Sequence, residues 1–392
     1  MKNKVAILGG ARTPMGCLKG ELAALSAVSL GVTAVEGAIS KSQIDPEMID
    51  EVFMGCVLPA GLKQSPARQV AIGAGITADA GAVTINKVCG SGMQASIFGY
   101  DSIVSQSNKV VIAGGMESMS NAPHFVTGAR NGIKTGHSSL YDHMFIDGLE
   151  DAYTGRSMGS FAQETADKYG VSREEMDNYA IDSLNRALSA EKTGKLKNEI
   201  VPIKIDNRKT SYEVFDDEQP HRVSEKKIQS LKPAFAKNGT ITAANTSSIS
   251  DGASALVLAD SSFSAPLNGE PFAYVVGHAR HSLSPNDFTM APINAIRKLL
   301  EKVGWSLKDV DLFEINEAFA MVPILAMLEL GIDHAKVNVH GGACAQGHPI
   351  GSSGSRIIVT LINALHTYGK SKGVASLCIG GGEATAIAIE VI

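Results

Sequence analysis

The chain has 392 residues, of which 44% are hydrophobic and 19% are charged, and its formal net charge is −5. This length allows two or three domains with large cores, and an acidic chain without a basic stripe argues against nucleic acid as a main partner. No run of about 18 apolar residues occurs, which excludes a membrane-spanning helix. The five cysteines form no CxxC pair, so we expect no structural zinc site, no disulfide scaffold and a reduced, cytoplasmic protein.

Apolar segments alternate with glycine-rich turns, which is typical of strand–turn–helix units. The opening segment, MKNKVAILGGARTP, is too short in its apolar part to be a signal peptide, and we interpret it as a first strand. Residues 82–88 predict a strand. A helix is predicted next, because apolar residues recur at i, i+4, i+7 and i+11 from Met93, and residues 110–113 predict another strand.

The middle of the chain, residues 120–249, is more polar. We expect a helix there that begins at a capping box formed by Ser172 and Glu175. We interpret this region as an inserted loop domain over one half of the protein, placed to carry substrate-binding surface. Helix and strand signals then return, with a helix predicted over 318–330 and a strand over 376–379.

Three short stretches of the first part of the chain recur near its end. Residues 7–12 resemble 275–280 at an offset of 268, 89–92 resemble 353–356 at 264, and 115–117 resemble 381–383 at 266. The helical spacing that starts at Met93 is repeated from Ile357. Shared order and offset predict two similar α/β halves. The predicted domains are an N-terminal half (1–119 and 250–269), the inserted loop domain (120–249) and a C-terminal half (270–392).

Cys89, in the sequence NKVCGSGM, is the first candidate for chemistry because it lies between a predicted strand and an amphipathic helix. The positive end of a helix lowers the pKa of a nearby thiol and stabilises the thiolate. The turn resembles the strand-to-helix elbow that presents hydrolase nucleophiles. The alternative is a buried structural cysteine.

Two further candidates lie in glycine-rich segments near the C-terminus. His348, in GGACAQGHPIG, could be a general base for a thiol, or a loop histidine bonded to backbone. Cys378, in LCIGGGE, lies at the carboxyl end of a predicted strand, where α/β folds place functional groups, although a strand cysteine is more often a core residue.

Asn316, in NEAF, could hold a water molecule or an oxyanion, and it is an equally good candidate for the N-cap of the following helix. Met158, Phe288 and Met290 are candidates for the wall of an apolar pocket, with ordinary core packing as the alternative. The remaining cysteines are assigned to packing: Cys17, Cys56 and Cys344.

Taken together, these motifs resemble the thiolase family. CGSGM at Cys89, NEAF at Asn316, GHPIG at His348 and CIGGGE at Cys378 occur in the family's order, and ARTP near the start and GGMESMS at 114–120 also match. The resemblance covers the whole chain and is strongest to the acetoacetyl-CoA branch. It implies a five-layer α-β-α-β-α sandwich of two duplicated halves with an inserted loop domain.

The resemblance also implies an acetyl-CoA C-acetyltransferase, which joins two acetyl-CoA molecules reversibly into acetoacetyl-CoA and CoA through an acetyl-cysteine, with ping-pong kinetics. Cys89 is the implied nucleophile, His348 its base, and Cys378 the acid/base at the α-carbon. Asn316 would hold a water that forms one oxyanion hole with His348. The backbone N–H groups of Cys89 and Gly380 would form the other.

Further residues and partners follow from the resemblance. The implied substrate and CoA contacts are Arg222, Lys227, Ser247, Met158, Phe235, Phe288 and Phe319. Coenzyme A is expected as substrate and product, with no tightly bound cofactor. Potassium is a candidate ion because Tyr179, Ala243, Ala244 and Thr246 fall where ion ligands of the family lie. We expect a homotetramer, a dimer of dimers with the insertion at its contacts, and no membrane partner.

Three alternatives stay open. One is a degradative 3-ketoacyl-CoA thiolase with a longer acyl pocket, and another is a noncatalytic acyl-CoA binder on the same fold. The joint presence of Cys89, His348 and Cys378 argues against the binder. A Cys-His hydrolase is the third, but it has no role for a second thiol, and the sequence shows no residue that orients His348.

Overall fold

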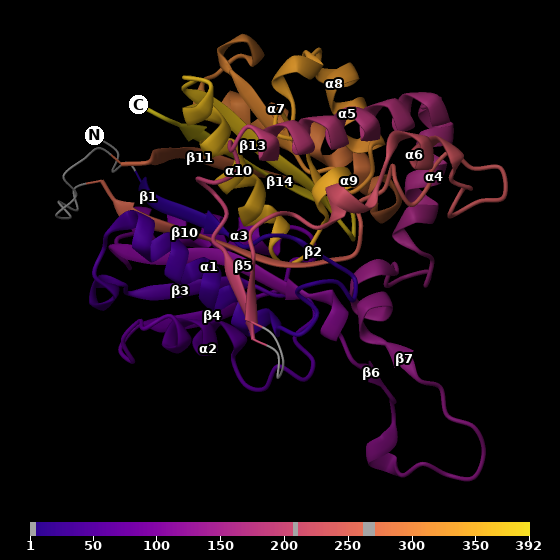
Figure 1. The fold of residues 1–392 in the computed structure, drawn as a ribbon, viewed down its shortest axis with the longest axis horizontal. Coiled ribbons are helices and arrows are strands. Elements are labelled where there is room, and N and C mark those ends of the chain that lie inside the picture. The colour runs from indigo at the N-terminus through magenta and orange to yellow at the C-terminus, as the bar shows by residue number, and fades with distance from the viewer. Residues whose placement is uncertain (1–4, 207–210, 262–270) are drawn as a thin grey trace.

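The computed structural model describes residues 5–206, 211–261 and 271–392. The N-terminal half contributes five strands and three helices, drawn mainly in indigo and purple in Figure 1. These are β1 (Val5–Arg12), β3 (Glu51–Gly55), β4 (Gly81–Ile85), β5 (Val110–Ser118), β10 (Ser250–Asp260), α1 (Ala27–Ser42), α2 (Pro66–Gly73) and α3 (Ser91–Val104). A two-residue strand, β2 (Gly16–Cys17), pairs with β10. Every residue of β1 and β5 is buried, as expected for strands covered on both faces.

The C-terminal half repeats this plan in orange and yellow (Figure 1). Its elements are β11 (Ala273–Ser282), β12 (Leu312–Ile315), β13 (Lys372–Ile379), β14 (Glu383–Glu390), α7 (Ala291–Val303), α8 (Met321–Leu330), α9 (Ala343–Gln346) and α10 (Ser353–Thr367). The counterpart of β4 is reduced to a single parallel bridge between Phe313 and Val337.

The two halves share one mixed sheet of ten strands. Its order is β12-β13-β14-β11-β1-β10-β5-β3-β4, with β2 beside β10. The halves meet where β1 pairs antiparallel with the start of β11, at Val5 with Val275 and Ile7 with Ala273. Each half therefore carries the same succession of strands outward from this central pair.

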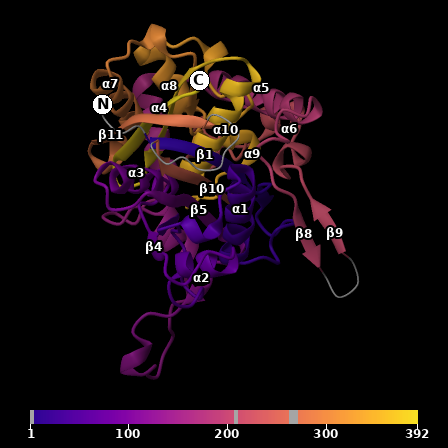
Figure 2. The same ribbon diagram turned by 90° about the vertical axis from the view of Figure 1, so that its left-hand side faces the viewer.

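Helices complete five layers. α1 and α2 cover the outer face of the N-terminal strands, α3 and α10 pack on each other between the two halves, and α7 covers the outer face of the C-terminal strands (Figures 1 and 2). The predicted α/β sandwich of two similar halves is confirmed. Two of the predicted repeats lie in matching elements: residues 7–12 and 275–280 lie in β1 and β11, and residues 89–92 and 353–356 lie at the starts of α3 and α10. The third repeat is wrong: residues 115–117 lie within β5, whereas residues 381–382 form the turn after β13.

The polar middle region lies between β5 and β10. It contains β6 (His124–Phe125), β7 (Tyr141–Asp142), α4 (Met158–Tyr169), α5 (Arg173–Lys192), β8 (Ile203–Asp206), β9 (Ser211–Val214) and α6 (Glu225–Ser230). The predicted capping box at the start of α5 is confirmed, since the Ser172 side chain accepts from the Glu175 N–H and the Glu175 side chain accepts from the Ser172 N–H. The segment around β6 and β7 projects from the body (Figures 1 and 2). The predicted domain boundary at residue 269 lies outside the described residues.

Candidate active site

Cys89 stands on a tight turn between β4 and α3. The strand ends at Ile85, three residues earlier than predicted, because Val88 adopts a left-handed conformation with φ +47°. A β-branched residue rarely adopts this conformation, and such strain marks functional turns. Ser91 holds the turn: its hydroxyl accepts from the Lys87 N–H at 2.8 Å and donates to the Val88 carbonyl at 2.6 Å. The predicted elbow is therefore present.

The Cys89 thiol lies in an apolar environment with two backbone donors. The backbone N–H groups of Cys89 and Gly380 favour the thiolate, but burial outweighs them and raises the pKa of Cys89 to about 11. The expected lowering of this pKa by the helix is therefore wrong. Both N–H groups act on the Cys89 sulfur, and backbone donors of this kind are what an oxyanion site uses.

His348 lies in the turn before α10 and is buried. Its Nδ1 is 2.5 Å from the Ser353 hydroxyl, and that hydroxyl donates its own proton to the Pro349 carbonyl at 3.0 Å. Ser353 must then accept from Nδ1–H, which leaves Nε2 unprotonated. Nε2 is buried and has no hydrogen-bond partner among the described residues. Burial, assisted by the Arg356 charge, lowers the pKa of His348 to about 3, so the ring is a neutral base.

Ser353 is thus the orienting residue that sequence reasoning missed. A serine five residues after the histidine gives no signal in a single sequence, because its role depends on the fold of the turn. Its position at the first residue of α10 places the hydroxyl back over this turn.

Cys378 lies near the carboxyl end of β13, fully buried, opposite Ala384 of β14. Burial and the nearby charge of an ionised Cys89 raise its pKa well above the ordinary value. The charge of one thiol therefore affects the pKa of the other, although the two residues come from different halves of the chain. Gly381 and Gly382 follow with φ values of +90° and +94°, which returns the chain sharply into β14 and leaves the Gly380 N–H directed at Cys89.

Asn316 follows β12 and is buried. Its N–H donates to the Ser376 carbonyl at 3.0 Å, and its Oδ1 is 3.4 Å from Nη2 of Arg356. The alternative role as N-cap of α8 is wrong, because that helix begins at Met321 with Ala320 at the cap. The Asn316 Nδ2 has no partner in the described part of the chain. Both it and His348 Nε2 are thus free to contact a substrate or water.

Glu117, within the GGMESMS motif, is a second group to which no role was assigned from sequence. Its carboxylate is completely buried and accepts from the N–H groups of Val57, Leu58 and Gly351 at 2.9–3.1 Å. Burial raises its pKa to about 7, against the effect of these donors. Glu117 ties the 56–58 loop to the turn that carries His348.

The predicted apolar wall is assembled from four segments. The Phe319 ring makes edge contacts with Phe235 at 6.3 Å and with Phe288 at 6.2 Å between centroids. Met158 packs against the same cluster, which also contains Cys378. A Cβ placed on Gly380 would lie 3.7 Å from the Met158 methyl carbon, so Met158 borders the N–H pair at Cys89. The structure therefore brings these four predicted residues into one apolar cluster with Cys378, and Met158 borders Gly380.

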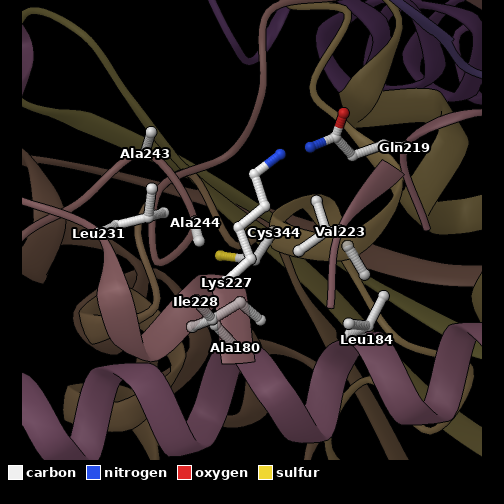
Figure 3. Close-up of a pocket in the computed structure, with 11 residues that line it drawn as sticks. Ala180, Leu184, Gln219, Val223, Lys227, Ile228, Leu231, Ala243, Ala244 and Cys344 are labelled. Carbon is white, nitrogen blue, oxygen red and sulfur yellow. The ribbon is translucent and has the colours of Figure 1, made fainter. Parts of the chain in front are cut away.

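The predicted CoA residues lie farther along the inserted region. The Ser247 hydroxyl donates to the Ala318 carbonyl at 3.1 Å, in a stretch that bridges to Phe319. Lys227 lines an apolar pocket of about 130 Å³ (Figure 3). Arg222 does not line this pocket. It is half exposed, pairs with Glu218, and lines a separate acidic hollow.

Figure 3 shows the apolar pocket between α5 and the 243–244 segment. It is lined by Ala180, Leu184, Gln219, Val223, Lys227, Ile228, Leu231, Ala243, Ala244, Cys344 and Ala345. Tyr179 is not among them: its hydroxyl donates to Glu317 at 3.1 Å and accepts from Asn338 at 3.2 Å. The Tyr179 oxygen keeps a free lone pair beside these two bonds, so its role as a potassium ligand and the ion itself both stay predictions.

Two further observations concern what the described residues contain. They hold no group of three or more His, Cys, Asp or Glu side chains that could bind a metal ion. Over the same residues, no helix combines the length and apolarity needed to cross a membrane.

Comparison with known proteins agrees with this geometry. Residues 5–262 match the family model "Thiolase, N-terminal domain" and residues 269–391 match "Thiolase, C-terminal domain". The chain is 45% identical to a probable acetyl-CoA acetyltransferase of Dictyostelium discoideum, over 98% of this chain and 94% of that one. It is 43% identical to the acetyl-CoA acetyltransferase of Cupriavidus necator, over 98% and 99%.

Two solved structures are similar over the full length. The Acat5 thiolase of Ascaris suum in complex with coenzyme A has a TM-score of 0.94 and 42% identity, covering 99% of this chain and all of that one. The acetyl-CoA acetyltransferase of Bacillus anthracis has a TM-score of 0.97 and 37% identity, covering 100% and 99%.

Proposed function

The chain belongs to the thiolase family, and we propose that it is an acetyl-CoA C-acetyltransferase, which converts two acetyl-CoA molecules reversibly into acetoacetyl-CoA and CoA. The observation that carries this proposal is a pair of thiols near each other, with Cys89 partly buried and Cys378 fully buried. The N–H groups of Cys89 and Gly380 favour the Cys89 thiolate, and the charge of that thiolate raises the pKa of Cys378. A hydrolase would need only one thiol, whereas condensation needs a nucleophile and a base at the α-carbon.

The first half-reaction acetylates Cys89. Its thiol gives a proton to Nε2 of His348, and the sulfur attacks the carbonyl carbon of acetyl-CoA. The N–H groups of Cys89 and Gly380 stabilise the resulting oxyanion. Collapse breaks the bond to CoA, whose thiolate takes the proton of Cys378 and leaves as CoA. The site then holds acetyl-Cys89, a protonated His348 and a Cys378 thiolate.

The second half-reaction forms the carbon–carbon bond. The Cys378 thiolate removes an α-proton from a second acetyl-CoA, and the enolate oxygen is held by Nε2–H of His348 and by a water on Asn316. The enolate carbon attacks acetyl-Cys89, and the departing Cys89 sulfur takes its proton back from His348. All three groups return to their starting protonation. In the cleavage direction a protonated Cys378 is the acid, which its raised pKa favours.

Substrate contacts extend from these thiols into the inserted region. Met158, Phe235, Phe288 and Phe319 form the wall around the acyl group, since they pack in one apolar cluster that also contains Cys378. Ser247 contacts the pantetheine arm, with Lys227 and Arg222 toward the nucleotide phosphates. Arg222 must break its ion pair with Glu218 before it can bind a phosphate, so of these three residues it needs the largest rearrangement.

The proposal includes an assembly and a compartment. We expect a homotetramer built from dimers, supported by the exposed edge strand β4, with Val83 43% exposed, and by exposed apolar residues on the projecting segment around β6 and β7. We expect a reducing compartment such as the cytoplasm, because all five cysteines are unpaired and two of them must be thiols for the reaction.

Thiolysis of acetoacetyl-CoA tests the function directly. Purified protein with CoA should consume acetoacetyl-CoA, and Cys89→Ser should lose the acetyl-enzyme and at least about 1,000-fold of the rate, because the nucleophile is absent. A C16 3-ketoacyl-CoA in parallel separates the degradative alternative. Equal or faster cleavage of that long substrate would contradict a short acyl pocket, and binding without turnover of either substrate would point to a noncatalytic binder.

A further inference from the structure

Arg356 is a buried cation beside the proposed active site. It lies on the first turn of α10, three residues after Ser353, and its side chain is completely buried. Nη1 is 3.1 Å from Glu314 Oε1, and Nη2 is 3.4 Å from Asn316 Oδ1. An arginine removed from water is retained only where its charge and donors are used. One use is the ion pair with Glu314, and the other is the contact with Asn316.

The contact with Asn316 decides which way its amide faces. A guanidinium has only donors, so the Asn316 oxygen must face Arg356 and the NH2 group must face the opposite side. In the reverse orientation the NH2 group of Asn316 would face the guanidinium N–H groups of Arg356, and no hydrogen bond could form. That other side holds the orphaned, buried Nδ2, which has no partner in the described structure. A pair of N–H groups is thereby presented where an oxyanion or its water would lie.

The same cation acts on the base. Among the charged groups, Arg356 is the one whose field lowers the pKa of His348, after burial itself. The thiols of Cys89 and Cys378 carry no charge at rest. Glu314, on β12, faces Arg356, and Glu317 and Glu199 act on Glu314 from farther away. Arg356 therefore bonds to the oxygen of Asn316, whose Nδ2 has no partner in the described structure, and its charge lowers the pKa of His348.

We propose that Arg356 is a positioning residue that acts through Asn316: its guanidinium fixes the amide so that the NH2 group points at the developing oxyanion. This inference rests on the proposed function, since it presumes that Asn316 serves the reaction. The competing explanation is that Arg356 only joins α10 to β12 through Glu314. In that case the loss of Arg356 would weaken the fold, and the effect would be the same whether Asn or Ala stood at position 316.

A double-mutant cycle separates these explanations. Removal of Arg356 alone would leave the buried Glu314 charge unpaired, so every variant carries Glu314→Gln, which can still accept from Nη1. The four proteins are Glu314→Gln alone, with Arg356→Met, with Asn316→Ala, and with both. The measurements are kcat and KM for acetoacetyl-CoA thiolysis and the melting temperature of each protein.

Relative to Glu314→Gln alone, we expect Asn316→Ala to lower kcat about 100-fold and Arg356→Met about 10-fold or more, with KM changed less than about twofold. The variant with both should be no more than about threefold slower than the Asn316→Ala variant, because residues that act through one another are not additive. Arg356→Lys should restore only part of the rate, since a single ammonium lacks the planar fork.

The inference would be overturned if the loss of kcat in the variant with both substitutions equalled the product of the two separate losses. Arg356 would then be a structural residue. A fall in melting temperature without a fall in kcat would overturn the inference as well. Should Glu314→Gln and the parent protein both lack thiolysis, the proposed function itself fails and the inference falls with it. An active parent with multiplicative effects refutes the inference alone.

Discussion

At the scale of single residues, the site rests in an uncharged state. Burial raises the pKa of Cys89 to about 11 and lowers that of His348 to about 3, so both the thiol and the imidazole are neutral near pH 7. A resting thiolate–imidazolium pair, as in many cysteine hydrolases, is therefore disfavoured. In the proposed mechanism the proton moves when a thioester carbonyl occupies the two N–H groups at Cys89, which would tie nucleophile formation to substrate binding and limit oxidation of the thiol between turnovers.

This state predicts how Cys89 responds to alkylation. The thiolate fraction of a thiol with a raised pKa increases tenfold per pH unit, so the rate of iodoacetamide labelling should rise with unit slope from about pH 7 to about pH 9, without a plateau. The expected His348 pKa is too low to add a transition in this range. Labelling is followed by peptide mass spectrometry, with Cys89→Ser as the control. A plateau near neutral pH would instead indicate a resting ion pair with His348.

Residues with their own motif could be predicted, and residues that support them could not. Cys89, His348 and Cys378 stand in glycine-rich segments that single them out as candidates in one sequence. Ser353 and Glu117 act through contacts made by the tertiary fold: Glu117 accepts from Gly351, 234 residues away. The error on the Cys89 pKa has the same origin, because the helix terminus is visible in sequence whereas burial of the sulfur is not.

At the scale of elements, the crossing of α3 and α10 sets the distance between the two halves of the site. The helices approach at glycines near their N-termini: a Cβ on Gly92 would lie 2.6 Å from the Ser355 hydroxyl and 2.8 Å from its backbone nitrogen. A Cβ on Gly354 would lie 2.3 Å from the Met93 nitrogen. Cys89 precedes one helix and His348 precedes the other, so this contact aligns nucleophile and base.

Gly92→Ala tests this alignment. The added methyl group meets backbone that cannot move alone, so the helices must separate, at a cost of about 1–3 kcal/mol in the free energy of unfolding. We expect kcat for thiolysis to fall about 10-fold, because small misplacements of reacting groups are costly. Unfolding by urea and steady-state kinetics measure the two effects.

Gly99→Ala, two turns along the same helix, is the matched control. Its Cβ would meet only side-chain atoms, Leu258 Cδ1 at 2.9 Å and Val111 Cγ2 at 3.0 Å, which can shift. It should retain kcat within about twofold, since it lies away from the helix crossing. A loss of kcat as large in Gly99→Ala as in Gly92→Ala would refute a specific role for the crossing.

The elements themselves were predicted where hydrophobic periodicity is strong. The two central helices and the opening strand are present as expected. The strand predicted over 82–88 is too long because the left-handed Val88 ends it, and periodicity carries no information about φ. The helix predicted from 318 begins at Met321, because Phe319 first bridges to Thr246 and Glu317 is held by Tyr179 and Asn338.

At the scale of the whole molecule, duplication brings the proposed catalytic groups together. The two halves share one sheet across β1 and β11, and the N-terminal half supplies Cys89 while the C-terminal half supplies His348 and Cys378. The repeated motifs predicted the two halves. The pairing of β1 with β11 could not be predicted, because it joins positions about 270 residues apart and depends on how the halves stack. Each half alone would lack part of the site.

The projecting segment around β6 and β7 gives the last prediction. This segment extends away from the body in Figure 1. Its Ile133 and Leu140 are 66% and 65% exposed, and we expect these apolar side chains to contact another subunit. In the proposed homotetramer, Ile133→Asp with Leu140→Asp should therefore halve the mass measured by light scattering and leave kcat within about twofold, because the catalytic groups lie in the body of each subunit. Leu328→Asp on α8, a residue 69% exposed, is the matched control and should leave the mass unchanged. An unaltered mass in the segment variant, or dissociation caused by Leu328→Asp alone, would place the tetramer contact elsewhere.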